Sequence, residues 1–313
     1  MAVPPNSNRA APNSFANRPM SEPSPSFIHY AGHRLAILSH YNPQATLLPV
    51  VWIHGLTASF RFWEAAMYPE IRAARSWYSI SLPLHHPSTY AGNVSQTDLG
   101  ETVFAELVHR AVESVIPAGP FHMAGYSLGA FACLNYAAKH PGRVLSVISI
   151  GGFMTGRAKG LEGVLQFFSD GNLLRKSLFY AGWWIMQRHV FFLKMATVFY
   201  ARRWRRLLSY PALDPTLRDI FPDVSRHSIH GQRVFFRYLL DMDLMDEVDK
   251  IDIPVLAIAG TRDPIIPFEH QYACAKRLAC GQLLALDGVG HVAFAEADAS
   301  FKSAVLSWLA QYD

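Results

Sequence analysis

Apolar residues along the chain gather in short continuous runs that alternate with stretches of helical periodicity. The runs have the length and composition of strands buried in a sheet: LLPVVWIHG (47–55), WYSISLP (77–83), FHMAG (121–125), VLSVISIGG (144–152), IPVLAIAG (253–260) and GQLLALDG (281–288). Helical spacing is found over 62–74, over 95–115, from Ser127 to the HPG at 140–142, over 268–280 and over 299–312. Ahead of these, FIHYAGHRLAILSH (27–40) predicts two strands joined by a turn at Ala31-Gly32.

The order of these elements predicts an α/β fold, with a mostly parallel sheet and helices on both of its faces. The alternation breaks after residue 153, where a long helical and aromatic-rich stretch intervenes. A connection of that length is too long for a simple loop. We therefore expect an inserted helical cap over 154–248 and one α/β domain formed by 27–153 and 249–313.

Residues 1–26 are dominated by Pro, Asn and Ser, and they contain no apolar stretch long enough for a secretory signal. We expect a disordered tail that carries no chemistry. Because two arginines and no acid precede Glu22, an organelle transit peptide is the alternative.

Composition narrows the class of protein. Half of the 313 residues are apolar and 17% are charged, which is typical of a globular protein with a sizeable core. Cys133, Cys274 and Cys280 form no zinc-type pattern, and Cys274 and Cys280 are too poorly spaced on one predicted helix for a disulfide. We expect buried thiols and a cytoplasmic location.

The segment MAGYSLGAFA (123–132) places Ser127 between Gly125 and Gly129, where a predicted strand meets a predicted helix. A sharp turn there would hold the serine in a strained conformation, with room only for small residues two positions away. Such a turn exposes the serine Oγ at the carboxyl edge of the sheet, near a helix N-terminus that favours developing negative charge. The alternative is a structural serine in a glycine-flanked turn.

In this context the segment resembles the nucleophile turn of the α/β-hydrolase fold family, in particular its cap-bearing, esterase- and lipase-like branch, and the resemblance covers about residues 27–313. It implies a serine, an acid and a histidine in that order along the chain. VLAIAGTRDPIIP (255–267) supplies Asp263 after an apolar run, in a form similar to the family's Gly-x-x-Asp-x-x-x-Pro segment. The earlier position used by some relatives, SIGGFMTG (149–156), contains no carboxylate. A turn aspartate before a proline is the alternative.

The resemblance also implies the remaining parts of such a site. ALDGVGHVAFAEAD (285–298) supplies His291, the histidine that follows the last predicted strand, so the implied triad is Ser127, Asp263 and His291. The backbone amides of Leu128 and of Leu56, in the His-Gly loop after an early strand, would form the oxyanion hole. His54 in that loop is expected to organise the loop rather than to catalyse.

One loop departs from the family's Asp-x-Pro-Gly-x-Gly pattern. ISLPLHHPSTY (80–90) lacks those glycines and contains His85 and His86. We expect solvated loop histidines, with contact to substrate or to a metal as the alternative. Since no pair of acids joins them, we expect no metal. We also expect no cofactor, because the implied triad needs none.

The predicted cap combines positive charge with aromatic residues. Residues 154–210 contain ten Lys or Arg and two acids, a local net charge of +8 against +4 for the chain. Aromatic residues recur at intervals of four and seven, which predicts that most of them pack the cap onto the α/β domain. We assign Tyr126, Trp183 and Trp184 to a substrate pocket. The alternative for the cap is an apolar acyl tunnel with RRWRR (202–206) contacting anionic lipid at a membrane surface.

These residues predict a serine hydrolase of carboxylic esters with an apolar acyl or alcohol part. The alternatives on the same triad are hydrolysis of a thioester, lactone, amide or C–C bond, acyl transfer and perhydrolysis. A ligand-binding protein without turnover is a further alternative. Nucleic-acid binding is not expected, because no nucleic-acid module accompanies the basic residues. The oligomeric state is left open.

Overall fold

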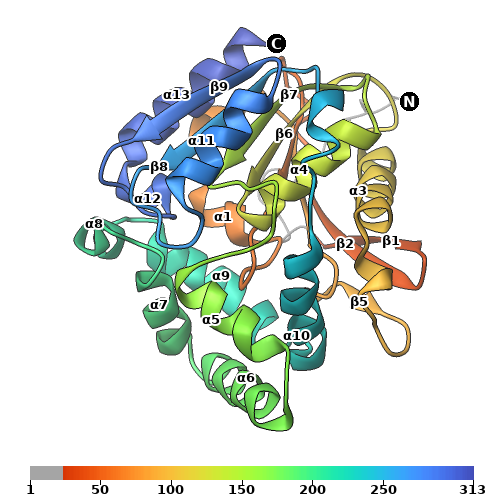
Figure 1. Cartoon of the computed structure of the whole chain (residues 1–313). Coiled ribbons are helices and arrows are strands. Elements are labelled where there is room, and N and C mark those ends of the chain that lie inside the picture. The colour runs from red at the N-terminus through yellow and green to blue at the C-terminus, as the bar shows by residue number, and fades with distance from the viewer. Residues whose placement is uncertain (1–23) are drawn as a thin grey trace, which may run out of the picture.

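A nine-stranded sheet runs through the centre of the computed structural model, which describes residues 24–313 (Figure 1). The strands are β1 (Ser26–Tyr30), β2 (His33–His40), β3 (Val50–Ile53), β4 (Trp77–Ile80), β5 (Thr89–Tyr90), β6 (Phe121–Tyr126), β7 (Val144–Ile150), β8 (Val255–Gly260) and β9 (Gly281–Leu286). They lie in the order β1-β2-β4-β3-β6-β7-β8-β9, and β5 pairs with β2. All pairs from β4 to β9 are parallel, and β2 pairs antiparallel with β1, β4 and β5. The predicted mostly parallel sheet is confirmed.

Helices cover both faces of the sheet. Those outside the insertion are α1 (Phe62–Ala66), α2 (Pro69–Ala74), α3 (Glu101–Val115), α4 (Leu128–Lys139), α11 (Phe268–Arg277), α12 (Ala293–Glu296) and α13 (Asp298–Gln311). On β6, Phe121 packs against Tyr136 of α4, whereas the neighbouring His122 bonds to Ser146 of β7, which also accepts a hydrogen bond from Trp308 of α13. Because successive side chains of a strand point to opposite faces, α4 and α13 lie on opposite sides of the sheet.

The break in the alternation is a helical insertion between β7 and β8. It contains α5 (Gly160–Ser169), α6 (Leu173–Met186), α7 (Val190–Val198), α8 (Trp204–Leu208), α9 (Leu213–Val224) and α10 (Ile229–Tyr238). In Figure 1 these helices, coloured green to teal, gather below the sheet. Short 3₁₀ turns at Leu239–Asp241 and Val248–Lys250 lead back to β8.

Several predicted boundaries were wrong for local reasons. The helix expected over 62–74 is two helices, α1 and α2, because the chain turns at Met67 and restarts with Pro69 at the first helical position. In the stretch expected to be helical from residue 95, the amide and hydroxyl of Ser95 both donate to Asp98, at 2.7 Å each, which closes a turn. A 3₁₀ turn (Thr97–Leu99) follows, and α3 begins only at Glu101.

The cysteines match the expectation only in part. Cys133 and Cys274 are buried free thiols, but Cys280 is exposed, because α11 ends at Arg277 and leaves Cys280 in the turn before β9. The tail predicted for 1–26 falls almost entirely on residues 1–23, which lie outside the described residues. None of the helices within 24–313 is both long and apolar enough to cross a bilayer.

Candidate active site

Ser127 stands at the turn from β6 into α4 in a backbone conformation that few residues adopt. Its φ is +54° and its ψ is −116°, a strained combination for a residue with a side chain. The neighbouring backbone leaves no room on either side: a Cβ on Gly125 would lie 2.2 Å from the Gly129 carbonyl oxygen, and a Cβ on Gly129 would lie 2.2 Å from that of Ile53. The two glycines therefore let β3, β6 and α4 approach closely enough to force the turn.

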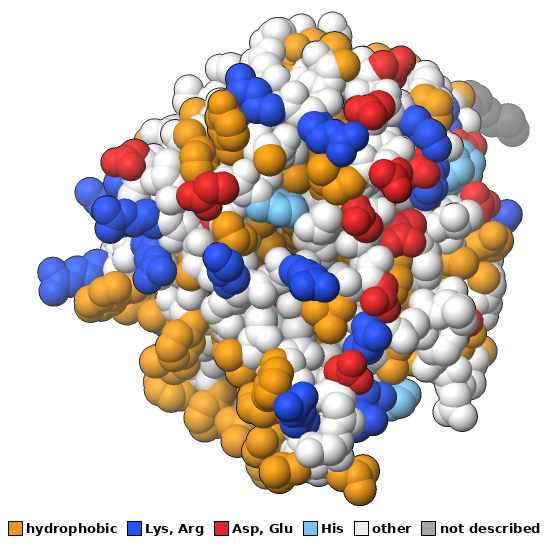
Figure 2. Space-filling model, in the orientation of Figure 1, with side chains coloured by type: hydrophobic (Ala, Val, Ile, Leu, Met, Phe, Trp, Pro, Cys, Tyr) orange, Lys and Arg blue, Asp and Glu red, His pale blue; other side chains and the backbone are white. Residues whose placement is uncertain are grey.

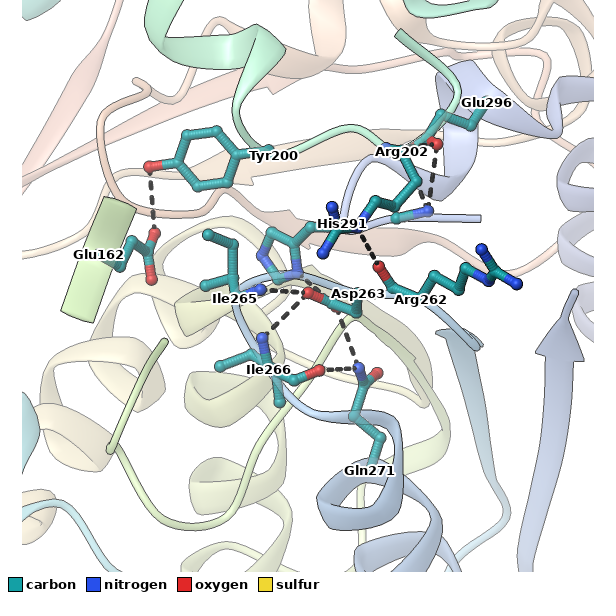
Figure 3. A network of polar contacts seen from close by, with 11 residues as sticks. Glu162, Tyr200, Arg202, Arg262, Asp263, Ile265, Ile266, Gln271, His291 and Glu296 are labelled. Atoms are coloured by element: carbon teal, nitrogen blue, oxygen red, sulfur yellow. Dashed lines mark hydrogen bonds and ion pairs between the residues drawn. The ribbon is translucent and has the colours of Figure 1, made fainter. Parts of the chain in front are cut away.

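Asp263 follows β8 and holds His291 in place. Its Oδ2 lies 2.7 Å from His291 Nδ1 and also accepts a hydrogen bond from Gln271 Nε2 at 3.0 Å. Its Oδ1 accepts the amides of Ile265 and Ile266 at 2.8 and 2.9 Å. Figure 3 shows this carboxylate enclosed by its four donors. The arrangement fixes the ring of His291 with Nδ1 donating and Nε2 free to accept a proton.

Ser127 and His291 line the same cavity, whose empty volume is about 700 Å³ including its open mouth. Both Ser127 Oγ and His291 Nε2 are buried, and neither has a hydrogen-bond partner among the described residues. Two unpartnered polar atoms on one cavity wall are costly unless a ligand engages them. The structure thus brings together the three residues that the sequence assigned to a triad.

Most of the cavity wall is apolar and comes from two parts of the chain. One wall belongs to the α/β domain and includes Leu56, Ala58, Phe62, Tyr126, Val292 and Phe294. The other belongs to the insertion and includes Leu193, Leu207, Leu213, Leu217 and Ile220. The cavity lies where these two parts meet, which is a common place for a small-molecule site.

Of the expected oxyanion donors, Leu56 lines this cavity, and Leu128 directly follows the cavity-lining Ser127. Leu128 is the first residue of α4, so its amide has no acceptor within the helix. Leu56 lines the cavity next to Thr57, whose φ of +57° marks a strained turn. His54 organises this loop: its Nδ1 donates to the Gly55 carbonyl at 2.7 Å and its Nε2 accepts the Leu82 amide at 3.1 Å.

His85 corrects the expectation of solvated loop histidines. Its side chain is fully buried, with ring centroids 5.3 Å from His54, 5.0 Å from His227 and 5.7 Å from Phe235. His227 follows α9. Its Nδ1 accepts a hydrogen bond from the His86 amide at 2.9 Å, and its Nε2 lies 3.0 Å from the Ala58 carbonyl oxygen. Burial lowers the pKa of His85 to about 4 and lowers the pKa of His54 and His227 well below 6.5. These neutral imidazoles connect the loop around Leu56 to the insertion.

Trp183 and Trp184 do not line the cavity, so two of the three residues assigned to the pocket were wrong. Trp183 stacks on Phe179 at 5.6 Å and meets Phe236 of α10, inside the insertion. Trp184 points the other way on α6 and is half exposed, with Arg188 above its ring. Only Tyr126 of the three is part of the wall.

Glu162 and Tyr200 reach the cavity from the insertion, and sequence reasoning missed both. Glu162 is buried, and its Oε1 lies 3.4 Å from the Tyr200 hydroxyl (Figure 3). Burial raises the pKa of Glu162 to about 7. Burial would lower the pKa of His291, but the negative charge of Asp263 and its hydrogen bond, then the charges of Glu162 and Glu296, outweigh it and raise that pKa above 6.5. For Glu162, the signal available in the sequence was an isolated acid within a basic and apolar segment.

Glu296, also missed, connects the histidine loop to the insertion. Its buried carboxylate accepts the amide of Gly290, next to His291, at 3.1 Å and the amides of Arg202 and Arg203 at 3.0 and 2.6 Å. The His291 amide in turn donates to the Tyr200 carbonyl at 2.9 Å. The position of His291 is therefore coupled to the α7–α8 connection. Within residues 24–313, no three His, Cys, Asp or Glu side chains form a group that could hold a metal ion.

Comparisons with known proteins concern the fold and the family. Residues 49–298 match the α/β-hydrolase fold family. A probable lysophospholipase of Arabidopsis thaliana, BODYGUARD 1, is 24% identical over 78% of this chain and 54% of its own length. A pimeloyl-[acyl-carrier protein] methyl ester esterase of Neisseria meningitidis is 25% identical over 78% of this chain and 71% of its own. This chain thus spans about half the length of the first of these relatives.

The fold is also found in solved structures. The esterase EaEST of Exiguobacterium antarcticum superposes with a TM-score of 0.69 over 91% of this chain and 98% of its own, at 19% identity. At that identity the likeness concerns the fold alone.

The close approach at the turn predicts a large cost for a single methyl group. Gly125→Ala or Gly129→Ala should lower the free energy of unfolding by at least about 3 kcal/mol, the upper end of the usual cost of overpacking a core. Gly182→Ala is the matched control, because it lies inside α6 with nothing within 4 Å of its Cβ position. The control should gain up to about 1 kcal/mol in helix propensity. Urea denaturation measures all three, and wild-type stability of Gly125→Ala would contradict the packing described.

The buried histidines predict a loss of stability in acid. Unfolded His85 takes up a proton below pH 6.5, whereas the folded residue does so only near pH 4. The free energy of unfolding should therefore fall by about 3 kcal/mol between those pH values on account of this residue alone. His85→Leu should lose less stability over that range than the wild type, whereas His29→Leu, at an exposed histidine, should follow the wild type. Equal slopes for His85→Leu and wild type in denaturation curves recorded from pH 7 to 4 would refute this.

Proposed function

The chain belongs to the α/β-hydrolase fold family, and from that premise we propose that it is a serine hydrolase of carboxylic esters with an apolar acyl or alcohol part. The observation that carries the proposal is a pair of buried atoms, Ser127 Oγ and His291 Nε2, which line an apolar cavity and have no hydrogen-bond partner within residues 24–313. The hydrogen bond that His291 Nδ1 donates to Asp263 supports it, because it leaves Nε2 as the proton acceptor.

In the proposed reaction Ser127 Oγ attacks the ester carbonyl carbon while His291 Nε2 takes the serine proton. Asp263 stabilises the imidazolium that forms. The amides of Leu56 and Leu128 bind the oxyanion. His291 then returns the proton to the departing alcohol, which leaves an acyl-Ser127 ester. Water, deprotonated by His291, attacks this ester, and His291 returns that proton to Ser127 Oγ as the C–Oγ bond breaks and the carboxylic acid leaves. None of these steps requires a cofactor.

The substrate class is inferred from the cavity wall. Leu193, Leu207, Leu213, Leu217 and Ile220 offer no hydrogen bonds, so they favour an apolar chain. The names of the relatives point the same way, since one is a probable lysophospholipase and the other a methyl ester esterase.

Turnover of a p-nitrophenyl ester series from acetate to palmitate tests the proposal. Ser127→Ala should lower kcat on the order of a millionfold, and Asp263→Asn should lower it about ten-thousandfold because the imidazole loses its orientation. The chain length with the highest kcat/KM should exceed that of acetate, since the wall is apolar. Full activity of Ser127→Ala would refute the assignment of the nucleophile. A wild type that reacts with a fluorophosphonate but hydrolyses no ester would refute the ester assignment.

The raised pKa of His291 predicts where activity falls in acid. His291 must be neutral to accept the serine proton, so kcat/KM should fall as the pH drops through a pKa above 6.5. Glu162→Gln removes a negative charge that raises this pKa, so the acidic limb should move to lower pH. Asp170→Asn is the matched control, because this second acid of the segment is exposed and pairs with Arg237. An acidic limb that stays in place or moves upward in Glu162→Gln would contradict the coupling.

A further inference from the structure

Large apolar side chains are exposed almost entirely on one part of the molecule. Of the sixteen exposed large hydrophobic residues among the described ones, thirteen lie between residues 164 and 208. Phe191 is 55% exposed and Phe199 is 64% exposed. Figure 2 shows hydrophobic side chains gathered along the lower left of the molecule, over α6, α7 and α8. Single exposed hydrophobic residues are ordinary, but a contiguous group of this size marks an interaction surface.

The aromatic residues of this segment were expected to pack the insertion onto the α/β domain, and most of them do not. Phe179, Trp183 and Tyr200 are buried, whereas Trp184, Phe191, Phe192 and Phe199 are exposed. The chain divides at the turn between α6 and α7, so no single helical face collects them. Folding of the insertion therefore does not account for the exposed half.

Helices α7 and α8 each present apolar side chains on two faces. On α7, Leu193 lines the cavity while Phe191 and Phe192 face solvent. On α8, Leu207 lines the cavity while Trp204 faces solvent. A helix with apolar side chains on two faces is best accommodated where both faces meet an apolar environment. The outer surface is thus separated from the cavity by the thickness of one helix, about 10 Å.

Basic side chains accompany the exposed apolar ones. Arg188 lies 4.0 Å above the Trp184 ring and Arg205 lies 5.2 Å above the Trp204 ring. Residues 154–210 have a net charge of +8, and one of their two acids, Glu162, is buried. In Figure 2 Lys and Arg side chains gather at the left end of the apolar strip, over α8. Tryptophan next to arginine suits a boundary between an apolar and an aqueous phase.

We propose that the exposed surface of α6, α7 and α8, here called the outer cap surface, binds an anionic lipid surface. Apolar side chains would enter the acyl region while the arginines meet the negative headgroups. The charge favours this partner over a second copy of the chain, because a two-fold contact would place two strongly basic surfaces face to face. The binding itself goes beyond the proposed function. The delivery of a lipid ester from this surface past α7 and α8 into the cavity, in contrast, rests on the proposed function.

Vesicle binding of the full chain tests the proposal. The probes are vesicles of phosphatidylcholine alone and of phosphatidylcholine mixed with phosphatidylglycerol. The chain should sediment with the mixed vesicles more than with the neutral ones, and added salt should release it. Tryptophan emission should shift to the blue, because Trp184 and Trp204 are the exposed tryptophans of residues 24–313 and would leave water.

Two variants separate the apolar and the ionic contributions. Phe191→Ser with Phe199→Ser should lower partitioning onto the mixed vesicles at least about tenfold, since each ring buries a large apolar area. Arg205→Gln with Arg206→Gln should lower it about fivefold per residue on the mixed vesicles and leave neutral vesicles unaffected. The matched control is Tyr41→Ser with Leu47→Ser, exposed apolar residues outside the insertion, which should bind as the wild type does.

A failure of vesicle binding can be told apart from a failure of the proposed hydrolase activity. None of these substitutions lies in the cavity wall, so fluorophosphonate labelling of Ser127 and turnover of a short soluble ester should stay unchanged, which also shows that the variants fold. A wild type that ignores anionic vesicles overturns the proposal, as does equal loss of binding in the control. If light scattering shows a dimer that Phe191→Ser with Phe199→Ser converts to a monomer, and no vesicle binding is found, the surface is an interface between copies.

Discussion

The close approach of three backbone segments around Ser127 is the constraint on which the rest of the site depends. Gly125 and Gly129 bring β3, β6 and α4 so near that a single Cβ would lie 2.2 Å from a carbonyl oxygen. That contact holds Ser127 at a positive φ at the start of α4, where the amide of Leu128 has no acceptor within the helix. The strain is sustained because β6 is the centre of a buried parallel sheet, where every residue is enclosed. A nucleophile on a flexible loop would lack this fixed direction.

The histidine side of the site depends on the insertion as much as on the sheet. Asp263 fixes the ring of His291 through a bond within the α/β domain, but the backbone of His291 donates to Tyr200, and Glu296 binds the amides of Arg202 and Arg203. Near Leu56, buried neutral imidazoles connect the loop of that residue to the segment after α9. A shift of the insertion would therefore move both the proposed base and the loop of the proposed oxyanion hole. The insertion is part of the site and more than a cover over it.

The sequence was most informative where a residue's position follows from its own strand. Ser127, Asp263 and His291 follow β6, β8 and β9, and parallel strands bring such ends to one edge of the sheet. Together with the resemblance to the family, this made it possible to predict which residues meet there. Trp183 and Trp184 could not be placed, because their exposure depends on how α6 packs against α10, which periodicity does not specify. His85 looked like a loop residue, yet it is buried by His227 and Phe235, more than 140 positions along the chain. Contacts between distant segments left no local pattern to find.

The insertion is apolar on its inner side and also on part of its outer side, and its folding explains only the inner side. Its inner side must be apolar to close the cavity, which Leu193 and Leu207 accomplish. Its outer side carries Phe191, Phe192 and Trp204 in contact with water, at a cost in solubility that polar residues would avoid without changing the cavity. Arginines lie over the exposed tryptophans, so positive charge stands at the edge of the apolar surface. Such a combination is stabilised where an apolar phase and negative charge occur together, and an anionic lipid surface supplies both.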